Sequence, residues 1–212
     1  MKTSLPEGRE MRAAAASVEL EYRADNQQPA AIVGQAIVCG VRSVTMGAPG
    51  FRFVEIISAR ALDGADISEV EGVFNHNSDI LLGHTRSGTM TLTRAEDGGL
   101  RYHIPFDAED PDHQRVSRKI KRGDVTGSSF VFDIPKGGDE WAEERAADGT
   151  PLFVRTVNQF RRIYDVCPVT NPAYLNTTTA KRSLDAYAEE HPAPAAPTYD
   201  LLEAELALKS RC

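Results

Sequence analysis

The chain has 212 residues, a formal net charge of −7 and 26% charged residues, which suits one globular domain and excludes fibrous or disordered chains. The acidic balance argues against nucleic acid as the main partner, because phosphate binding needs a basic face. The sequence has no apolar run of membrane-spanning length, and we expect no secretory signal. Three widely spaced cysteines without a CxxC pair are typical of a reducing compartment. We therefore expect a soluble cytoplasmic domain.

The first half of the chain is rich in β-type patterns. Residues 1–29 are polar and alanine-rich, and we expect a partly disordered leader or an edge strand there. The strongest hairpin signal is a pair of alternating runs around the Asp97-Gly98-Gly99 turn. The strands predicted in this half are 31–38, 51–57, 89–93 and 100–106.

One helix has clear start and stop signals. Asp110 suits the N-cap, Pro111 suits the first helical position, and Gly123 ends the helix. The apolar stripe consists of His113, Val116 and Ile120. The opposite face is basic, which is typical of a solvated surface. Further strands are predicted at 125–134, 152–159 and 161–169, with an acidic loop at 135–149.

Proline and alanine dominate the C-terminal part. We expect a linker and a short amphipathic helix within 186–212, the helix near 200–209, after a main domain at 30–185. Many strands with few helices favour a mainly β (α+β) fold. A long meander must hide its edges, so we predict a closed or nearly closed β-barrel.

The chemistry-bearing residues first exclude metal and phosphate sites. His76, His84 and His103 lack HxH or HExxH spacing, and no glycine-rich phosphate loop is present, so neither a metal nor a cofactor is expected. Ser128 and Ser129 follow a glycine and lead into an apolar strand. A nucleophilic serine needs a base and a group that orients the base.

His76 and Asp165 are candidates for these two roles. His76 follows an apolar run, and Asp165 lies inside an apolar stretch, where a carboxylate is costly unless it is paired or hydrogen-bonded. Patterning alone leaves two interpretations open: a Ser/His/Asp group, or separate structural residues with satisfied hydrogen bonds.

Four sequence blocks within about residues 30–180 occur in a fixed order. They are Asn75–Asn77, Leu82–Leu92 with Gly99–Tyr102, Arg122–Phe132 and Tyr164–Tyr174. These segments resemble the NHD, LGRTxSGTLxL…GLxxE, RGDVSGMSFGF and YEVSPVTxPAY blocks of the tailed-phage prohead serine protease family.

The resemblance implies a role for each matched residue. Ser129 stands at the nucleophile position and Ser128, at the variable position before it, is the second candidate. His76 matches the general base. Asp165 stands where the family usually has Glu, as the third member of the triad.

Three other positions depart from the family pattern. Val131 replaces a glycine and places Cβ bulk beside the nucleophile, so we expect a narrower cleft. His84 replaces an arginine and is a rival base, although we favour a turn or cleft-lining role. Cys167 replaces a serine that is not the nucleophile, so it is a third and poorer nucleophile candidate.

The resemblance also implies a biological setting. The expected fold is a barrel of the herpesvirus assemblin type. The expected activity is endopeptidase cleavage of scaffolding protein or the scaffold-like segment of the capsid precursor, and of the protease itself. It would act without metal inside the immature capsid, in the host bacterial cytoplasm. Expected partners are these proteins and further copies of the chain, without nucleic acid or membrane.

Two alternatives stay open. Because Asp165 and Val131 depart from the family pattern, the chain is alternatively a catalytically weak or silent prohead assembly or scaffold-binding module. The C-terminal leucines either dock on a scaffold or capsid subunit or pack nowhere in particular.

Overall fold

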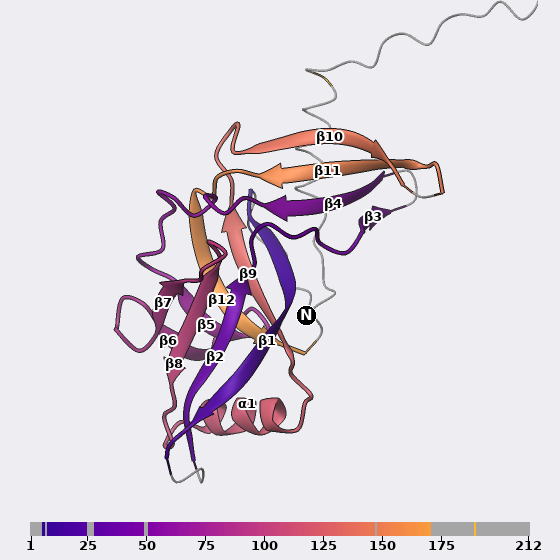
Figure 1. Ribbon diagram of the computed structural model, residues 1–212. Coiled ribbons are helices and arrows are strands. Elements are labelled where there is room, and N and C mark those ends of the chain that lie inside the picture. The colour runs from indigo at the N-terminus through magenta and orange to yellow at the C-terminus, as the bar shows by residue number, and fades with distance from the viewer. Residues whose placement is uncertain are drawn as a thin grey trace, which may run out of the picture.

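The structure is a computed structural model that describes residues 6, 8–24, 28–48, 51–146, 148–170 and 189. This part of the chain is mainly β, with one short helix and two sheets. Figure 1 shows the smaller sheet across one end of the larger one and the helix at the opposite end. No helix in the described part is both long and apolar enough to span a membrane.

The larger sheet has eight strands. Their spatial order is β6 (Asn77–His84), β5 (Glu71–Phe74), β12 (Arg162–Val169), β9 (Gly127–Asp133), β1 (Glu10–Tyr22), β2 (Pro29–Ile37), β8 (Leu100–Pro105) and β7 (Thr91–Arg94). All neighbours are antiparallel except β12 and β5, which are parallel.

The smaller sheet has four strands, in the order β10 (Asp139–Arg145), β11 (Pro151–Val157), β4 (Phe51–Ile57) and β3 (Met46–Ala48). β11 and β4 run parallel, and the other pairs are antiparallel. The helix α1 (Pro111–Lys121) contacts β1 and β6.

Several sequence-based predictions are confirmed. The runs at 31–38 and 51–57 form β2 and β4, and the predicted hairpin is formed by β7 and β8. In α1, the Asp110 side chain accepts a hydrogen bond from the Asp112 amide at 2.7 Å. The helix ends before Gly123, whose φ of +79° is readily adopted only by glycine.

The core lies against the centre of the larger sheet. Every residue of β9 is buried, so this strand is covered on both faces. Phe130 and Phe132 point into the main core and contact Phe160, with ring centroids 6.0 and 4.9 Å from it. Because successive side chains of a strand alternate, Ser129 and Val131 point to the opposite face. The nucleophile candidate therefore lies on the face away from the aromatic core.

Two predicted segments differ from the structure. The acidic loop predicted at 135–149 contains β10, of which only Trp141 is buried, so the strand carries little apolar signal. The edge strand expected in 1–29 is wrong: β1 lies inside the sheet, between β9 and β2. Its charged Glu10 and Arg12 are buried in ion pairs. The sequence of this interior strand therefore has the polar pattern of an exposed strand.

The closed barrel is not found among the described strands, whose pairing ends at β6 and β7. Four of the twelve strands form the separate sheet instead. β5 and β6 were not predicted as strands, because they are short or mostly exposed. The C-terminal linker and helix expected in 186–212 lie outside the described residues, except for position 189.

Candidate functional site

Three neighbouring parts of the larger sheet bring the predicted site residues together. Ser129 lies on β9, Asp165 lies on β12, and His76 lies in the turn between β5 and β6. β12 is hydrogen-bonded to both β9 and β5, and its Cys167 is directly opposite Ser129. Since residues i and i+2 of a strand share a face, Asp165 and Cys167 point to the same side as Ser129.

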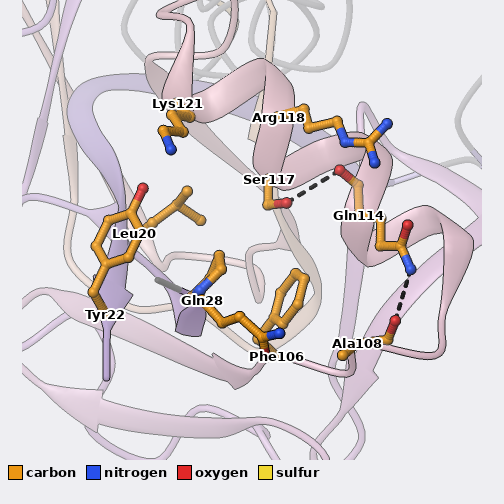
Figure 2. A pocket seen from close by; sticks show the side chains of 10 residues that line it. Leu20, Tyr22, Gln28, Phe106, Ala108, Gln114, Ser117, Arg118 and Lys121 are labelled. Carbon is orange, nitrogen blue, oxygen red and sulfur yellow. Dashed lines mark hydrogen bonds between the residues drawn. The ribbon is translucent and has the colours of Figure 1, made fainter. Parts of the chain in front are cut away.

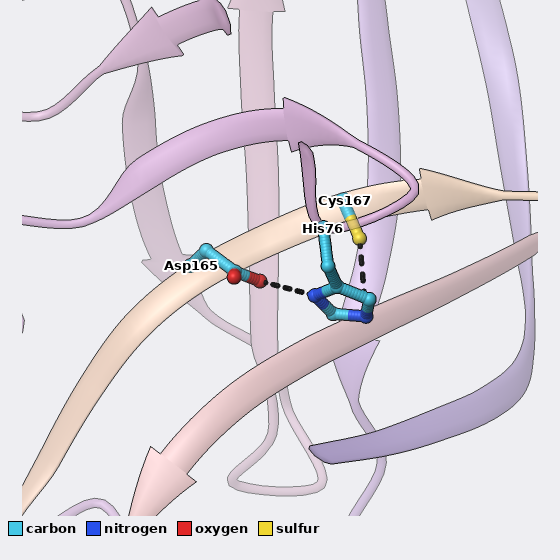
Figure 3. Close-up of side chains that lie close together, drawn as sticks. All are labelled: His76, Asp165 and Cys167. Atoms are coloured by element: carbon cyan, nitrogen blue, oxygen red, sulfur yellow. Dashed lines mark hydrogen bonds and ion pairs between the residues drawn. The ribbon is translucent and has the colours of Figure 1, made fainter. Parts of the chain in front are cut away.

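The imidazole of His76 bridges the serine and the aspartate. Its Nδ1 lies 2.8 Å from Asp165 Oδ1, and its Nε2 lies 2.6 Å from Ser129 Oγ. Figure 3 shows the Asp165 carboxylate pointing at the ring from β12. A hydroxyl, an imidazole and a carboxylate bonded in this order are the components of a nucleophilic serine site.

A strained turn presents His76. Phe74 pairs with Asn77, so Asn75 and His76 are the two central residues of the turn, with φ values of 53° and 56°. Two consecutive positive φ values are typical of a type I′ hairpin turn, and Asn and His tolerate that region better than most residues do. The turn points the imidazole back over the sheet.

The end of β12 fixes this turn. The Asn75 amide donates to Pro168 O at 3.1 Å, and Asn75 Oδ1 accepts from the Thr170 amide at 3.0 Å. The strand that carries Asp165 therefore also holds the backbone that carries His76. Neither Asn75 nor Thr170 was predicted to have a role; the signal available for Asn75 was the preference of asparagine for positive φ.

The serine hydroxyl has two possible acceptors. Ser129 Oγ lies 2.8 Å from the backbone oxygen of Arg12 on β1, besides its contact with His76. A hydroxyl carries one hydrogen. When Nδ1–H donates to Asp165 and Nε2 is unprotonated, the hydroxyl donates to Nε2. When Nε2 is protonated, it donates to Oγ and the hydroxyl turns to the Arg12 carbonyl. The protonation state of His76 therefore decides where the serine hydrogen points.

The site is covered at the serine and open at its far end. Ser129 is 1% exposed, while the side chains of His76 and Asp165 are 11% and 16% exposed. Such shielding strengthens the hydrogen bond and charge interactions within the group. It also means that a ligand first meets the imidazole and the carboxylate.

The structure favours Ser129 over the two other nucleophile candidates, Ser128 and Cys167. Ser128 points to the other face, where its Oγ lies 3.0 Å from the Tyr102 hydroxyl, and both residues are buried. Cys167 Sγ lies 3.5 Å from His76 Nε2, farther than Ser129 Oγ. Burial, and then the charge of Asp165, raise the pKa of the Cys167 thiol well above its usual range, which disfavours the thiolate.

Among the remaining predicted positions, His84 and His103 bond to other partners, whereas Val131 adjoins the serine site. His84 ends β6, and its Nδ1 accepts from the Arg86 amide at 2.9 Å, in agreement with the expected turn role. His103 lies on β8, where it pairs with Glu21 at 3.4 Å. Val131 is buried and directly opposite Asp165 in the sheet.

The backbone oxygen of Arg12 contacts Ser129, whereas its side chain belongs to a buried group of charged residues. We call it the ionic cluster; its members are Glu10, Arg12, Glu55, Asp139 and Arg155. Arg12 binds both oxygens of Glu55 at 2.8 Å, and Arg155 binds both oxygens of Glu10 at 2.6 and 2.8 Å. The cluster connects β1 to β4, β10 and β11. Sequence reasoning missed it, because charges that are distant in sequence give no signal of pairing.

These ion pairs set the ionisation of their members. Burial alone would raise the pKa of the Glu10 carboxyl, but the hydrogen bond and charge of Arg155, with the charge of Arg12, hold that pKa below its usual range. Glu10 is therefore a carboxylate in the folded protein at neutral pH.

A separate cavity of about 280 Å³ lies beside α1 (Figure 2). Leu20, Tyr22 and Phe106 form its apolar wall, and Arg118 and Lys121 from the helix add positive charge. None of Ser129, His76 and Asp165 lines it. The cavity is therefore distinct from the serine site.

One group of possible metal donors occurs among the described residues. His76, Asp165 and Cys167 each place one donor atom within 4.8 Å of the others. Asp165 is bonded to Nδ1 of the ring, whereas Cys167 lies near Nε2. The two residues thus contact opposite nitrogens of one imidazole (Figure 3).

One comparison with known proteins finds a family for this chain. The model of the family described as Caudovirus prohead serine protease matches residues 17–190, a range that contains Ser129, His76 and Asp165. No curated protein and no solved structure matches the chain. The match covers most of the 212 residues, and the chain belongs to the Caudovirus prohead serine protease family.

Proposed function

We propose that the protein is a serine endopeptidase that cleaves scaffold or capsid-precursor protein, and also itself, during maturation of a phage prohead. The observation that carries this proposal is the pair of contacts made by one imidazole, 2.6 Å to Ser129 Oγ and 2.8 Å to Asp165 Oδ1. Family membership adds the setting, since the family is one of prohead serine proteases.

The proposed reaction is acyl transfer. Ser129 Oγ attacks a peptide carbonyl carbon while its hydrogen passes to His76 Nε2. The tetrahedral intermediate collapses to an acyl-enzyme as Nε2–H protonates the leaving amine. Water, deprotonated by Nε2, then releases the acyl group and regenerates the serine. Asp165 accepts from Nδ1–H, which keeps Nε2 facing the serine and stabilises the charged ring.

The Arg12 carbonyl opposes this reaction in the arrangement described. It offers the serine hydrogen an alternative acceptor at 2.8 Å, and Ser129 is only 1% exposed. A peptide carbonyl contacts Oγ only after the segments that cover it move. The same burial favours the second candidate function, a catalytically silent module that binds scaffold or capsid subunits.

The setting that we propose follows from the family. The protease acts inside the immature capsid, in the cytoplasm of the bacterial host, on capsid-related proteins. Self-association of the chain, implied by the sequence resemblance, stays a prediction.

Co-expression with the capsid precursor tests the proposal. Mass spectrometry of the assembled particles is compared for the wild type, Ser129→Ala and the control Ser128→Ala. We expect cleaved precursor with the wild type and with Ser128→Ala, and a loss of about 10⁴-fold or more with Ser129→Ala. An intact precursor in all three, with the protein still packaged, would instead support the silent module. Loss of cleavage in Ser128→Ala alone would contradict the assignment of the nucleophile.

A further inference from the structure

Cys167 lies within the serine site, and the proposed reaction does not use it. Its Sγ is 3.5 Å from His76 Nε2, and the residue is completely buried in a small apolar cluster with Val73 and Val169. The backbone pairing of β12 with β9 sets it directly opposite Ser129. Figure 3 shows the sulfur next to the ring, on the side opposite Asp165.

The separation of nitrogen and sulfur fits two ligands of one metal ion. A tetrahedral zinc with Zn–N of about 2.0 Å and Zn–S of about 2.3 Å holds these two atoms about 3.5 Å apart. The separation in the structure is 3.5 Å, so the spacing of the two atoms fits two ligands of one ion. Ser129 Oγ lies 2.6 Å from Nε2. Two ligand atoms of one tetrahedral zinc lie farther apart than this, so Oγ has to move by several tenths of an ångström when the metal binds.

Asp165 completes the arrangement from outside the coordination shell. Histidines that bind metals usually donate their other ring N–H to a carboxylate, which fixes the tautomer and makes the ligating nitrogen more basic. Asp165 Oδ1, at 2.8 Å from Nδ1, accepts this N–H, which leaves Nε2 unprotonated and makes it more basic. The carboxylate that positions the base for proteolysis thus also prepares Nε2 to bind a metal.

We propose that His76 Nε2 and Cys167 Sγ form a site for a thiophilic divalent cation of the zinc class. On binding, the thiol proton is released to solvent and the S–metal and N–metal bonds form. The metal then occupies the nitrogen that has to accept the proton of Ser129. Bound metal therefore switches off the proteolysis that we propose above, and the inhibitory part of this inference rests on that function.

The donor set also determines which ions bind. A thiolate and an imidazole favour zinc-like ions, whereas Mg²⁺ and Ca²⁺ prefer oxygen ligands. The apolar side chains of Val73 and Val169 around the sulfur add no oxygen donors. The partly exposed His76 and Asp165 leave the imidazole side as the route of entry. We expect inhibition by Zn²⁺ and none by Mg²⁺.

Binding is tested with Co²⁺ on the full-length protein, independently of any activity. We expect a thiolate-to-cobalt charge-transfer band that saturates at one ion per chain and is abolished by Zn²⁺. The band should persist in Cys39→Ala and Cys212→Ser and be lost in Cys167→Ser. Asp165→Asn should keep the band but weaken the affinity about 10- to 100-fold, as for a residue that orients a ligand. Circular dichroism verifies that each variant is folded.

Proteolysis supplies a second readout. Zn²⁺ should inhibit the wild type reversibly, with recovery on adding a chelator, and Cys167→Ser should be at least tenfold less sensitive. A wild type without a cobalt band, or a folded Cys167→Ser variant that retains it, overturns the metal site. A cobalt band in a protein that cleaves nothing supports the site and contradicts only the proposed proteolysis.

Discussion

Two polar groups meet at β1, and they are bonded in different ways. In the ionic cluster, Arg12 and Arg155 each bind both Glu10 and Glu55, so any single contact has others beside it. In the serine site, each link is one hydrogen bond, and the serine hydrogen has two alternative acceptors. Redundant contacts hold strands in place, whereas single contacts allow a proton to move.

Arg12 belongs to both groups. Its guanidinium is fixed by the ionic cluster, while its backbone oxygen contacts Ser129 Oγ. The carbonyl that competes for the serine hydrogen is therefore held by a rigid anchor. Substitutions in the serine site should lower the rate of cleavage and change the unfolding free energy little. Substitutions in the ionic cluster should lower the unfolding free energy and change the cleavage rate less.

The largest expected effect separates His76 from His84. His76→Ala removes the proton acceptor, so we expect a loss of about 10⁶-fold in cleavage rate, as when one member of a group that acts as a unit is removed. His84→Ala is the control, because its ring contacts only the turn around Arg86 among the bonds described. Rates are measured on purified capsid precursor. Similar losses in both variants would contradict the assignment of the base.

A smaller effect is expected in the ionic cluster. Arg155→Met leaves Glu10 and Asp139 with fewer partners in a buried setting, which costs about 3–5 kcal/mol of unfolding free energy. Arg42→Met removes an exposed pair with Glu144 and should cost much less, because water and salt screen exposed ion pairs. Urea unfolding measures both. Equal losses would mean that the buried contacts contribute no more than surface ones do.

The smallest effect concerns the pH dependence of stability. The pKa of Glu10 is lower in the folded than in the unfolded protein, because its pairing with arginines outweighs burial. Its stabilisation is therefore fully present above the unfolded pKa of about 4.5 and is lost as pH falls through the folded pKa. We expect the acid loss of unfolding free energy to be smaller in Glu10→Gln than in the wild type. Denaturant unfolding between about pH 3 and 7 measures it, and identical slopes would contradict this role of Glu10.

Local patterns predicted those elements whose residues carry their own signals. The hairpin of β7 and β8 has alternation and a glycine turn, and α1 has a cap, a proline and an apolar stripe. The grouping of Ser129, His76 and Asp165 was predictable only through the family blocks. Three residues spread over about ninety positions leave no local pattern that joins them.

Other features depend on contacts that the sequence does not encode locally. β1 appeared polar because its charges find partners on β4 and β11, more than forty positions away. β10 has one buried side chain, so its pattern resembles a loop. The Arg12 carbonyl at Ser129 is a backbone contact, and the identity of a side chain says nothing about it.

The position of β12 has a consequence for biosynthesis. Among the described strands of the larger sheet it is the last along the chain, yet it lies between β5 and β9. Before residues 162–169 leave the ribosome, the turn bearing His76 has no neighbouring strand to connect it to Ser129, and Asp165 has not yet joined them. A nascent chain therefore lacks an assembled centre, and long-range pairing of this kind is slow to form. Translation itself therefore delays assembly of the serine site until all the described strands have been made.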